Sequence, residues 1–152
     1  MEKFKLENNR FGKALVVLAP IKKDELLFTD TGIISAVQTK YSYQVDWNLH
    51  CEPDGPSAYL NHSCSPNVGI RVKKGGHPSF FALREIGPGE VLAIDYATFE
   101  YRTKVLCETR CLCGSDGCRE VIRGFVDLTR AQADAYGDYL ADYLLDSKKE
   151  LQ

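Results

Sequence analysis

The feature that most constrains this 152-residue chain is a compact cysteine cluster, spaced Cys111-x-Cys113-x4-Cys118. Structural zinc takes four ligands in a tetrahedron, usually thiolates or imidazoles. The cluster supplies three of them, and the glycine-rich turn at residues 114–117 can bring the sulfurs back to one ion. The one further candidate nearby is Cys107. The spacing therefore predicts a zinc site that ties the C-terminal part of the chain together.

The total of six cysteines is even, which also suits disulfides. The N-terminus, however, lacks the long apolar region of a signal peptide, so we expect a reducing, cytoplasmic compartment and a metal site. A net charge of −2 gives no electrostatic footprint for direct nucleic-acid binding. No apolar run of about 18 residues occurs, so no membrane association is expected.

Short apolar runs between turn residues predict strands over most of the chain. The expected strands cover residues 14–19, 25–28, 33–37, 42–47, 68–72, 79–84 and 90–94. Residues 51–57, with two prolines and a glycine, predict a loop, and residues 73–78 predict a hairpin turn. Strands this short, with no helices alternating between them, predict small antiparallel or mixed sheets.

The C-terminal tail has a different pattern. Thr129 is a suitable helix N-cap. After it, one stripe at helical spacing contains Tyr136, Tyr139, Leu140, Tyr143 and Leu144. We expect an amphipathic helix docked on the domain. The alternative is a helix that forms a homodimer or binds a partner.

Two further strings precede the cysteine cluster, Asn61-His62-Ser63-Cys64-Ser65-Pro66-Asn67 and Gly89-Glu90-Val91-Leu92-Ala93-Ile94-Asp95-Tyr96. In this order, the three strings resemble the SET-domain protein-lysine methyltransferases with a post-SET zinc motif. The resemblance covers about residues 11 to 122. It is to a minimal version, closer to bacterial or viral SET proteins than to multidomain chromatin enzymes.

The resemblance implies a fold. It is mainly β with some α, the β-clip of small curved sheets with a pseudoknot, in which the segment near Tyr96 threads past the one carrying Asn61. The expected parts are a SET domain at residues 1–106, a zinc-bound post-SET segment at 107–123 and a helical extension at 124–152.

The resemblance also implies the fourth zinc ligand. In post-SET enzymes the cysteine of the Asn-His-Ser-Cys string completes the tetrahedron, which favours Cys64 over Cys107. The zinc ligands are then Cys64, Cys111, Cys113 and Cys118. One zinc ion would pin the C-terminal segment over the active site and close a channel for the lysine side chain.

The cofactor that the resemblance implies is S-adenosyl-L-methionine. The residues expected to bind it are Gly12, Lys13, Ala14, Asn61, His62, Tyr96 and Ile122. SET enzymes usually have a Gly-x-Gly turn early in the chain, and here Ala14 replaces the second glycine. Alanine permits close backbone approach but disfavours a positive φ.

Tyr96 is the expected catalytic residue. Methyl transfer to an amine is an in-line displacement, so positioning contributes most of the rate. A nearby sulfonium and a dry channel disfavour the ammonium form of the lysine, so its proton can leave through water without a dedicated base. Tyr96 would orient the nitrogen lone pair.

The walls of the lysine channel depart from the family pattern. Asp30 stands where many members have a tyrosine, and Ile94 stands two positions before the catalytic tyrosine, where Phe or Tyr is common. We expect Tyr41, Tyr43, Ile70 and Ile94 to line the channel, with Tyr41 or Tyr43 as the aromatic wall. The aliphatic positions predict tolerance of di- or trimethyl-lysine.

The expected function is methylation of the ε-amino group of lysine in a protein or peptide substrate, a histone or another protein. Action on histones would require the nucleus, including a host nucleus, rather than the cytoplasm. The alternative is a catalytically inactive SET-like module that keeps the zinc and binds protein. Asp30, Ala14 and Ile94 favour this alternative, whereas intact Asn61, His62 and Tyr96 favour the enzyme.

Overall fold

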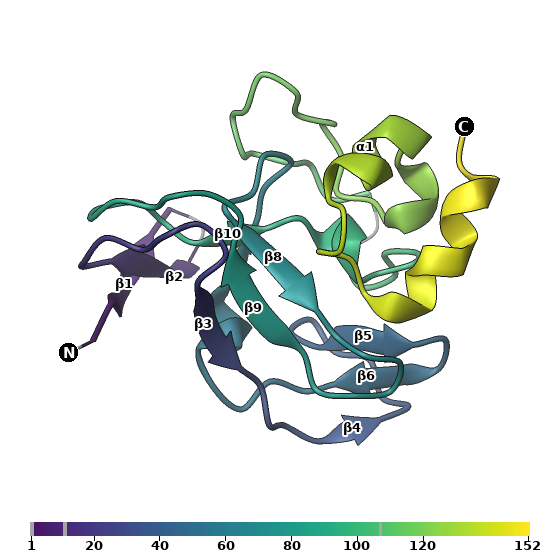
Figure 1. Ribbon diagram of the computed structural model, residues 1–152, viewed down its shortest axis with the longest axis horizontal. Coiled ribbons are helices and arrows are strands. Elements are labelled where there is room, and N and C mark those ends of the chain that lie inside the picture. The colour runs from purple at the N-terminus through teal and green to yellow at the C-terminus, as the bar shows by residue number, and fades with distance from the viewer. Residues whose placement is uncertain (1, 11, 107) are drawn as a thin grey trace.

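The computed structural model describes residues 2–10, 12–106 and 108–152. Within these residues the strands form sheets of two, five and three strands, seen along the left, centre and lower right of Figure 1. The strands are β1 (Phe4–Asn9), β2 (Gly12–Val17), β3 (Leu26–Thr29), β4 (Ile34–Ser35), β5 (Tyr43–Asp46), β6 (Leu49–Cys51), β7 (Asn61–His62), β8 (Val68–Arg71), β9 (Ser79–Ala82) and β10 (Ala93–Ile94). The sheet orders are β1-β2, β3-β9-β8-β10-β7 and β4-β6-β5.

Each strand expected from the sequence has a counterpart. The antiparallel pair β8 and β9 flanks the turn expected at residues 73–78, where Gly75 has a φ of 73°. The strand expected at 90–94 shortens to β10, because the backbone of residues 90–92 bonds instead to β2, where Val17 N–H donates to Glu90 O and Leu92 N–H donates to Leu15 O, both at 2.9 Å.

Three strands, β1, β6 and the two-residue β7, escaped the sequence pattern. β1 is almost entirely exposed, so it has no apolar alternation to detect. β6 ends at Cys51, the first residue of the expected loop, and it is too short to show a period. All three form because neighbouring strands supply their hydrogen-bond partners: β2 for β1, β5 with β4 for β6, and β10 for β7.

The parallel pairing of β10 brings the two sequence strings together. Ala93 lies opposite Asn61 and Ile94 opposite His62, and Ile94 also pairs with Val68 of β8. This is the neighbour relationship that the expected pseudoknot requires. The segment leading into Tyr96 therefore lies beside the segment that carries the Asn-His-Ser-Cys string.

The helical elements are short. They are the 3₁₀ helices η1 (Pro56–Tyr59), η2 (Tyr96–Thr98), η3 (Phe125–Asp127) and η4 (Asp142–Glu150) and the α-helix α1 (Arg130–Ala135). Thr129 caps α1 as expected, in a capping box in which its hydroxyl accepts from Gln132 N–H at 3.1 Å.

The single amphipathic helix expected after Thr129 is wrong. α1 ends at Ala135, and Gly137 takes a left-handed φ of 57°, which stops the helix. Backbone bonds from Ala141 N–H to Thr98 O and from Asp142 N–H to Val72 O then hold the chain against the domain before η4 begins. The apolar stripe therefore indicated which side chains are buried, such as Leu140 and Leu144, and not a single continuous helix.

The C-terminal segment shares the core of the sheets. Leu140 and Leu144 are fully buried, and they belong with Phe80 and Ile94 to one hydrophobic cluster. Figure 1 shows this segment, in yellow, packed beside β8 and β5. The docked arrangement that we favoured is therefore the one the structure has.

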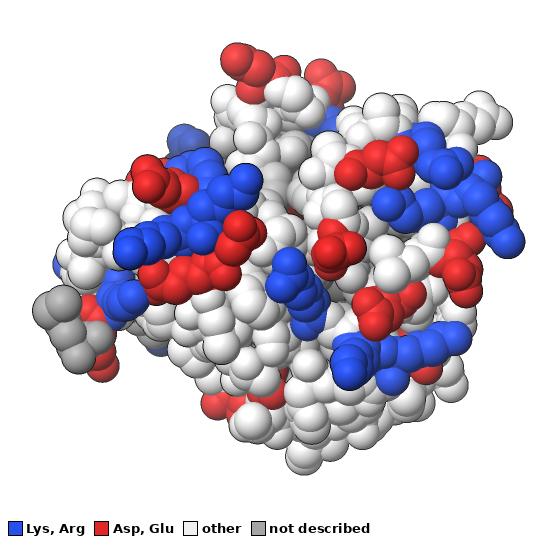
Figure 2. Space-filling model, viewed as in Figure 1, with Lys and Arg blue, Asp and Glu red and all other residues white. Residues whose placement is uncertain are grey.

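The surface carries charge of both signs. On the face drawn in Figure 2, Lys and Arg side chains are interspersed with Asp and Glu. Among the described residues, no helix has the length and apolar character needed to cross a bilayer.

Candidate functional site

Tyr96 is fixed at both ends. Asp95 caps η2 by accepting from Ala97 N–H at 3.0 Å, so Tyr96 starts a helical turn directly after β10. Its backbone N–H donates to His62 Nδ1 at 3.2 Å, and its hydroxyl donates to Leu60 O at 3.1 Å. The side chain therefore holds one orientation at the point where β7 and β10 run side by side.

Three cavities meet at Tyr96. The first is narrow, about 40 Å³, and has aromatic walls that include Tyr41 and Tyr43. The second, about 440 Å³, is lined by Asn61, His62 and Ile122, and the third, about 340 Å³, by Gly12, Lys13 and Asn61. Tyr96 and Leu106 line all three. The phenol ring thus stands between a small channel and two larger spaces.

These cavities gather most of the residues that we expected around the cofactor. Ala14 is the exception, since it is fully buried in β2 and lines none of the three. The positive φ of this turn, 107°, falls on Gly12 instead. The replacement of the second glycine by alanine therefore imposes no strain here.

His62 is neutral in this setting. Its side chain is only 4% exposed, and burial lowers its pKa to about 4 in spite of the nearby Asp95 carboxylate. Because Nδ1 accepts from Tyr96 N–H, the proton of the neutral ring resides on Nε2, which lies 3.5 Å from Cys64 Sγ. His62 thus connects the Tyr96 backbone with the cysteine cluster.

The Tyr96 hydroxyl stays protonated near neutral pH. Burial, with a contribution from Glu100, raises the pKa of this phenol to about 12. The group acts as a hydrogen-bond donor to Leu60 O and presents its oxygen lone pairs to a neighbour. Such a group can orient an amine but cannot take its proton.

The expected channel residues separate into two pairs. Tyr41 and Tyr43 line the narrow cavity, where Tyr43 is also a core residue whose hydroxyl donates to Ser57 O at 2.7 Å. Ile70 and Ile94 are fully buried in the core and line none of the three cavities. The structure does not bring the aliphatic pair to the channel wall.

Asp30 has a structural environment. It is 3% exposed, its Oδ1 accepts from Gly32 N–H at 3.0 Å and from Asp54 N–H at 3.2 Å, and Oδ2 accepts from the Ser57 hydroxyl. The aspartate therefore organises the loop beneath the site. Asp30 lines none of the three cavities, whereas Tyr43 lines the narrow one.

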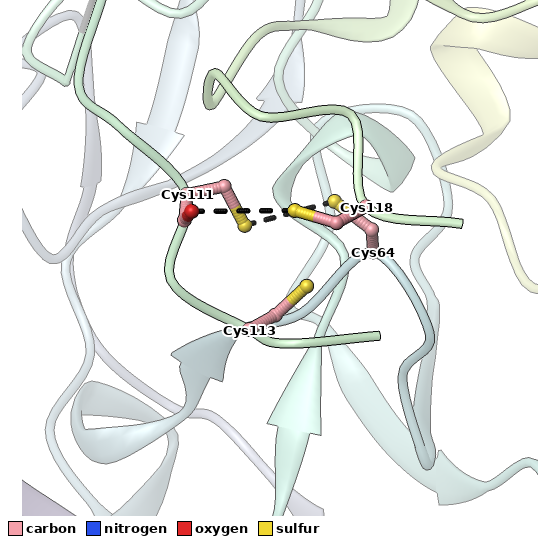
Figure 3. A group of neighbouring side chains, drawn as sticks. All are labelled: Cys64, Cys111, Cys113 and Cys118. Atoms are coloured by element: carbon pink, nitrogen blue, oxygen red, sulfur yellow. Dashed lines mark hydrogen bonds between the residues drawn. The ribbon is translucent and has the colours of Figure 1, made fainter. Parts of the chain in front are cut away.

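Four cysteines converge on one point (Figure 3). The sulfurs of Cys64, Cys111, Cys113 and Cys118 all lie within 4.8 Å of one another, and Cys64 Sγ lies 3.7 Å from Cys111 Sγ. Zinc at about 2.3 Å from four tetrahedral sulfurs would separate them by about 3.8 Å. These four residues are positioned to hold a metal ion, and Cys107 lies outside the described residues.

The surroundings of the sulfurs suit metal-bound thiolates. Backbone N–H groups of Arg119 and Glu120 each donate at 3.4 Å, the first to Cys64 Sγ and the second to Cys118 Sγ. Burial opposes ionisation of Cys113, but hydrogen bonds from Ser115 outweigh it and lower its pKa to about 6. Burial raises the pKa of the Cys64 and Cys111 thiols. A bound cation is what would keep all four deprotonated.

Asp95 joins the parts of the site, a role that the sequence did not reveal. This carboxylate is fully buried, with Oδ1 accepting from the Arg119 guanidinium at 2.7 Å and Oδ2 from the Tyr136 hydroxyl at 2.6 Å. Arg119 directly follows Cys118, and Tyr136 directly follows α1. Its position directly before Tyr96 was the only available signal.

Glu100 was missed altogether. It is 7% exposed, lines the narrow cavity with Tyr96, and accepts from Gln38 Nε2 at 3.1 Å. A single glutamate in an aromatic stretch gives no periodic or motif signal, so only the fold reveals that it is buried.

The profile of the SET domain family matches residues 12–97, more than half of the chain, and the chain therefore belongs to the SET domain family. Among similar curated proteins, the H3 lysine-9 specific histone-lysine N-methyltransferase KMT1 of Fusarium mangiferae is 36% identical over 81 residues, covering 45% of this chain and 24% of that protein. SUVH3 of Arabidopsis thaliana, also described as H3 lysine-9 specific, is 41% identical over 73 residues, covering 40% of this chain and 11% of that one. The chain thus spans a quarter or less of the length of these relatives.

Solved structures support the fold. KRYPTONITE in complex with DNA, an H3(1–15) peptide and SAH has a TM-score of 0.67 at 18% identity, covering 78% of this chain and 29% of that one. A structure described under the product specificity of histone lysine methyltransferases has a TM-score of 0.62 at 24% identity, covering 78% of this chain and 56% of that one. At these identities the likeness concerns the SET fold.

Proposed function

We propose that this protein transfers a methyl group from S-adenosyl-L-methionine to the ε-amino group of lysine in a protein substrate, with Tyr96 as its catalytic residue. One observation carries the proposal. Tyr96 stands where a narrow, aromatic-walled channel meets two larger cavities. A lysine side chain fits the first kind of space and a nucleoside cofactor fits the second.

The residues around the larger cavities suit the cofactor. Asn61 lines both, which suits it to hold the amino and carboxylate groups of the methionine part. Gly12 has a positive φ, and no heavy atom lies within 4 Å of the point where a Cβ would stand, so the backbone there is open to close approach. Ile122 offers an apolar surface for the adenine. When bound, the cofactor supplies an activated methyl group on a positively charged sulfur.

The chain's own residues then position the amine. Tyr96 holds its hydroxyl toward Leu60 O, so the phenol oxygen and this carbonyl together present acceptors at the junction of the cavities. Neutral His62 fixes the Tyr96 backbone through Nδ1. Removal of the amine from water in the narrow channel disfavours its ammonium form. Because the displacement needs alignment above all, this rigidity is the main contribution to rate.

Zinc would act at one remove from the chemistry. Cys64 lies just after β7, whereas the other three cysteines belong to the segment that carries Leu112 and Ile122 to the 440 Å³ cavity. A metal ion bound to all four would hold that segment over the cofactor. We propose a structural zinc site with thiolate ligands.

The substrate is proposed as a lysine-containing protein, with histone H3 as the first candidate because curated relatives are described as specific for its lysines. If histones are the substrate, the protein acts in a nucleus. The homodimer that we considered from the C-terminal stripe would have to use its exposed side chains, since Tyr143 and Leu144 are buried within the chain.

The alternative is a SET-like module that binds protein without catalysis. Its sequence support weakens, because Ala14 lies where no positive φ is needed and Asp30 has a structural role. Calorimetry with S-adenosylmethionine separates the two functions at the first step. The second step, methyl transfer, is tested by incubation with methyl-labelled cofactor, core histones and a cell extract, followed by mass spectrometry. Cofactor binding with no labelled lysine would favour the inactive module.

A further inference from the structure

Glu100 is a buried acid that the chemistry above does not use. It lies in the aromatic-walled channel with Tyr96, Tyr43 and Phe99, and its backbone N–H donates to Tyr96 O at 2.9 Å. Gln38 Nε2 donates to its Oε2 at 3.1 Å. Among the ion pairs of the described residues none involves Glu100, although Lys104 also lines the channel. A carboxyl group in such a place lacks the charged partner that buried acids usually have.

A second polar group in the same channel lacks a hydrogen-bond partner. The Thr103 hydroxyl is buried and has no hydrogen-bond partner among the residues that the structure describes. An alkylammonium ion has three N–H donors on a small, compact head, and aromatic faces attract it as well. The acid, the hydroxyl and the aromatic walls together have the chemistry of an ammonium site.

We propose that Glu100 receives the substrate lysine as its ammonium ion and takes its proton, which makes the amine neutral for methyl transfer. One N–H bond of the ammonium breaks and its electron pair stays on nitrogen as the lone pair. The proton forms an O–H bond on the carboxylate of Glu100 and later leaves for water. This inference rests on the proposed function and names a second catalytic residue for it.

The small size of the channel favours contact of an entering amine with Glu100. A space of about 40 Å³ holds only a few water-sized groups, and Tyr96 and Glu100 both line it. An amine that enters this space has both Tyr96 and Glu100 in its walls. Tyr96, held protonated, orients the nitrogen, and Glu100 supplies the base that a protonated phenol cannot.

The electrostatic setting suits a base that works near neutral pH. Burial raises the pKa of Glu100 to about 8, with Lys104 and the bond from Gln38 opposing the rise. Glu100 in turn contributes to the raised pKa values of Tyr43 of β5, Tyr96 of η2 and Tyr143 of η4, which are therefore uncharged near neutral pH. An incoming cation favours the carboxylate, so substrate entry itself would ionise the base.

The first experiment needs no methyl transfer. The full-length protein is labelled with ¹³C at glutamate carboxyls, the Glu100 signal is assigned by its loss in Glu100→Gln, and pH titrations are run with and without n-butylammonium. We expect a midpoint near 8 that falls when the amine is added. A midpoint in the ordinary range of about 4, or no response to n-butylammonium, would overturn the inference.

The second experiment measures the reaction. Near neutral pH, Glu100→Gln should lower kcat/KM for histone methylation by about 100-fold, a usual contribution of general base catalysis, with cofactor affinity and bound zinc unchanged. The loss should shrink when the lysine of an H3(1–15) peptide is replaced by S-(2-aminoethyl)cysteine, whose amine loses its proton more readily. Gln38→Leu should move the rising limb of the pH profile upward, because it removes a bond that favours the carboxylate.

Glu85→Gln is the matched control, since Glu85 is exposed and absent from the linings of these cavities. If Glu100→Gln methylates at the wild-type rate with the same pH profile, the inference fails and the proposed function stands. If n-butylammonium shifts Glu100 but no lysine is ever methylated, the proposed function fails and the ammonium site stands.

Discussion

The hydroxyl of Tyr136 donates a hydrogen bond to Asp95 Oδ2 at 2.6 Å, across 41 residues of sequence. The same carboxylate accepts from Arg119 at 2.7 Å through its other oxygen. Asp95, which directly precedes Tyr96, thus connects η2 with both the segment after the cysteine cluster and the C-terminal extension. The extension is therefore part of the site's support.

Tyr136→Phe should destabilise the protein by about 1.5–3 kcal/mol, because it removes a hydrogen bond to a buried charged group. Methyl transfer should fall as well, since the site loses one of its anchors. Urea denaturation measures the first effect. Tyr139→Phe is the control, because its hydroxyl bonds to Asp24 on the exposed surface. Equal stability of both variants would contradict the role given to Tyr136.

Zinc should be present at one ion per chain and depend on the four convergent cysteines. Cys64→Ser should lower zinc occupancy strongly, whereas Cys51→Ala should leave it intact, because Cys51 is buried away from the cluster. Cys107→Ser should lower zinc occupancy less than Cys64→Ser does. Elemental analysis of protein purified without chelator checks each variant. Chelation should abolish activity and leave most of the sheet signal in circular dichroism.

Tyr96→Phe should raise the activation barrier for methyl transfer by about 2–4 kcal/mol, the usual contribution of one oriented group. Methyl transfer should slow accordingly. The ring keeps its edge contact with His62, at 5.0 Å between centroids, so cofactor affinity should hardly change. Single-turnover rates with calorimetry of cofactor binding make the comparison. Unchanged turnover would remove Tyr96 from the chemistry.

Gly12→Ala should weaken cofactor binding and cost about 1–3 kcal/mol of stability, because a φ of 107° strains any residue with a side chain. Ala14→Gly restores the family's second glycine and should leave the cofactor Kd unchanged, since Ala14 lines neither large cavity. Calorimetry of both variants tests this pair. Tighter binding by Ala14→Gly would show that the second glycine matters here.

Glu100→Gln should make the protein more stable than the wild type at alkaline pH. In the folded state the pKa of Glu100 is about 8, above its ordinary value of 4.5, so between these values the unfolded chain is ionised while the folded one is not. Stability of the wild type therefore falls as pH rises through this window, by at most about 1.4 kcal/mol per unit, and then levels. Between pH 5 and pH 9 the urea midpoint should fall further for the wild type than for Glu100→Gln.

The sequence by itself determined the class of fold and pointed to most of the candidate site. Short apolar runs placed β2, β3, β5, β8 and β9, because a strand's inward face needs apolar side chains wherever it lies. The cysteine spacing and the Asn-His-Ser-Cys string identified four residues whose sulfurs do converge within 4.8 Å. The spacing of Cys111, Cys113 and Cys118 is readable because it depends on neighbours close in the chain, whereas Cys64 was assigned by the resemblance to post-SET enzymes.

The tertiary structure decided what depends on distant partners. The apolar stripe after Thr129 did not reveal that Gly137 would break the helix, because burial against Thr98 and Val72 outweighed helical periodicity. Ile94 had a family position, but packing made it a core residue. The burial of Asp95 and Glu100 follows from segments that meet only after folding, because solvent exclusion depends on the whole packed chain rather than on local sequence.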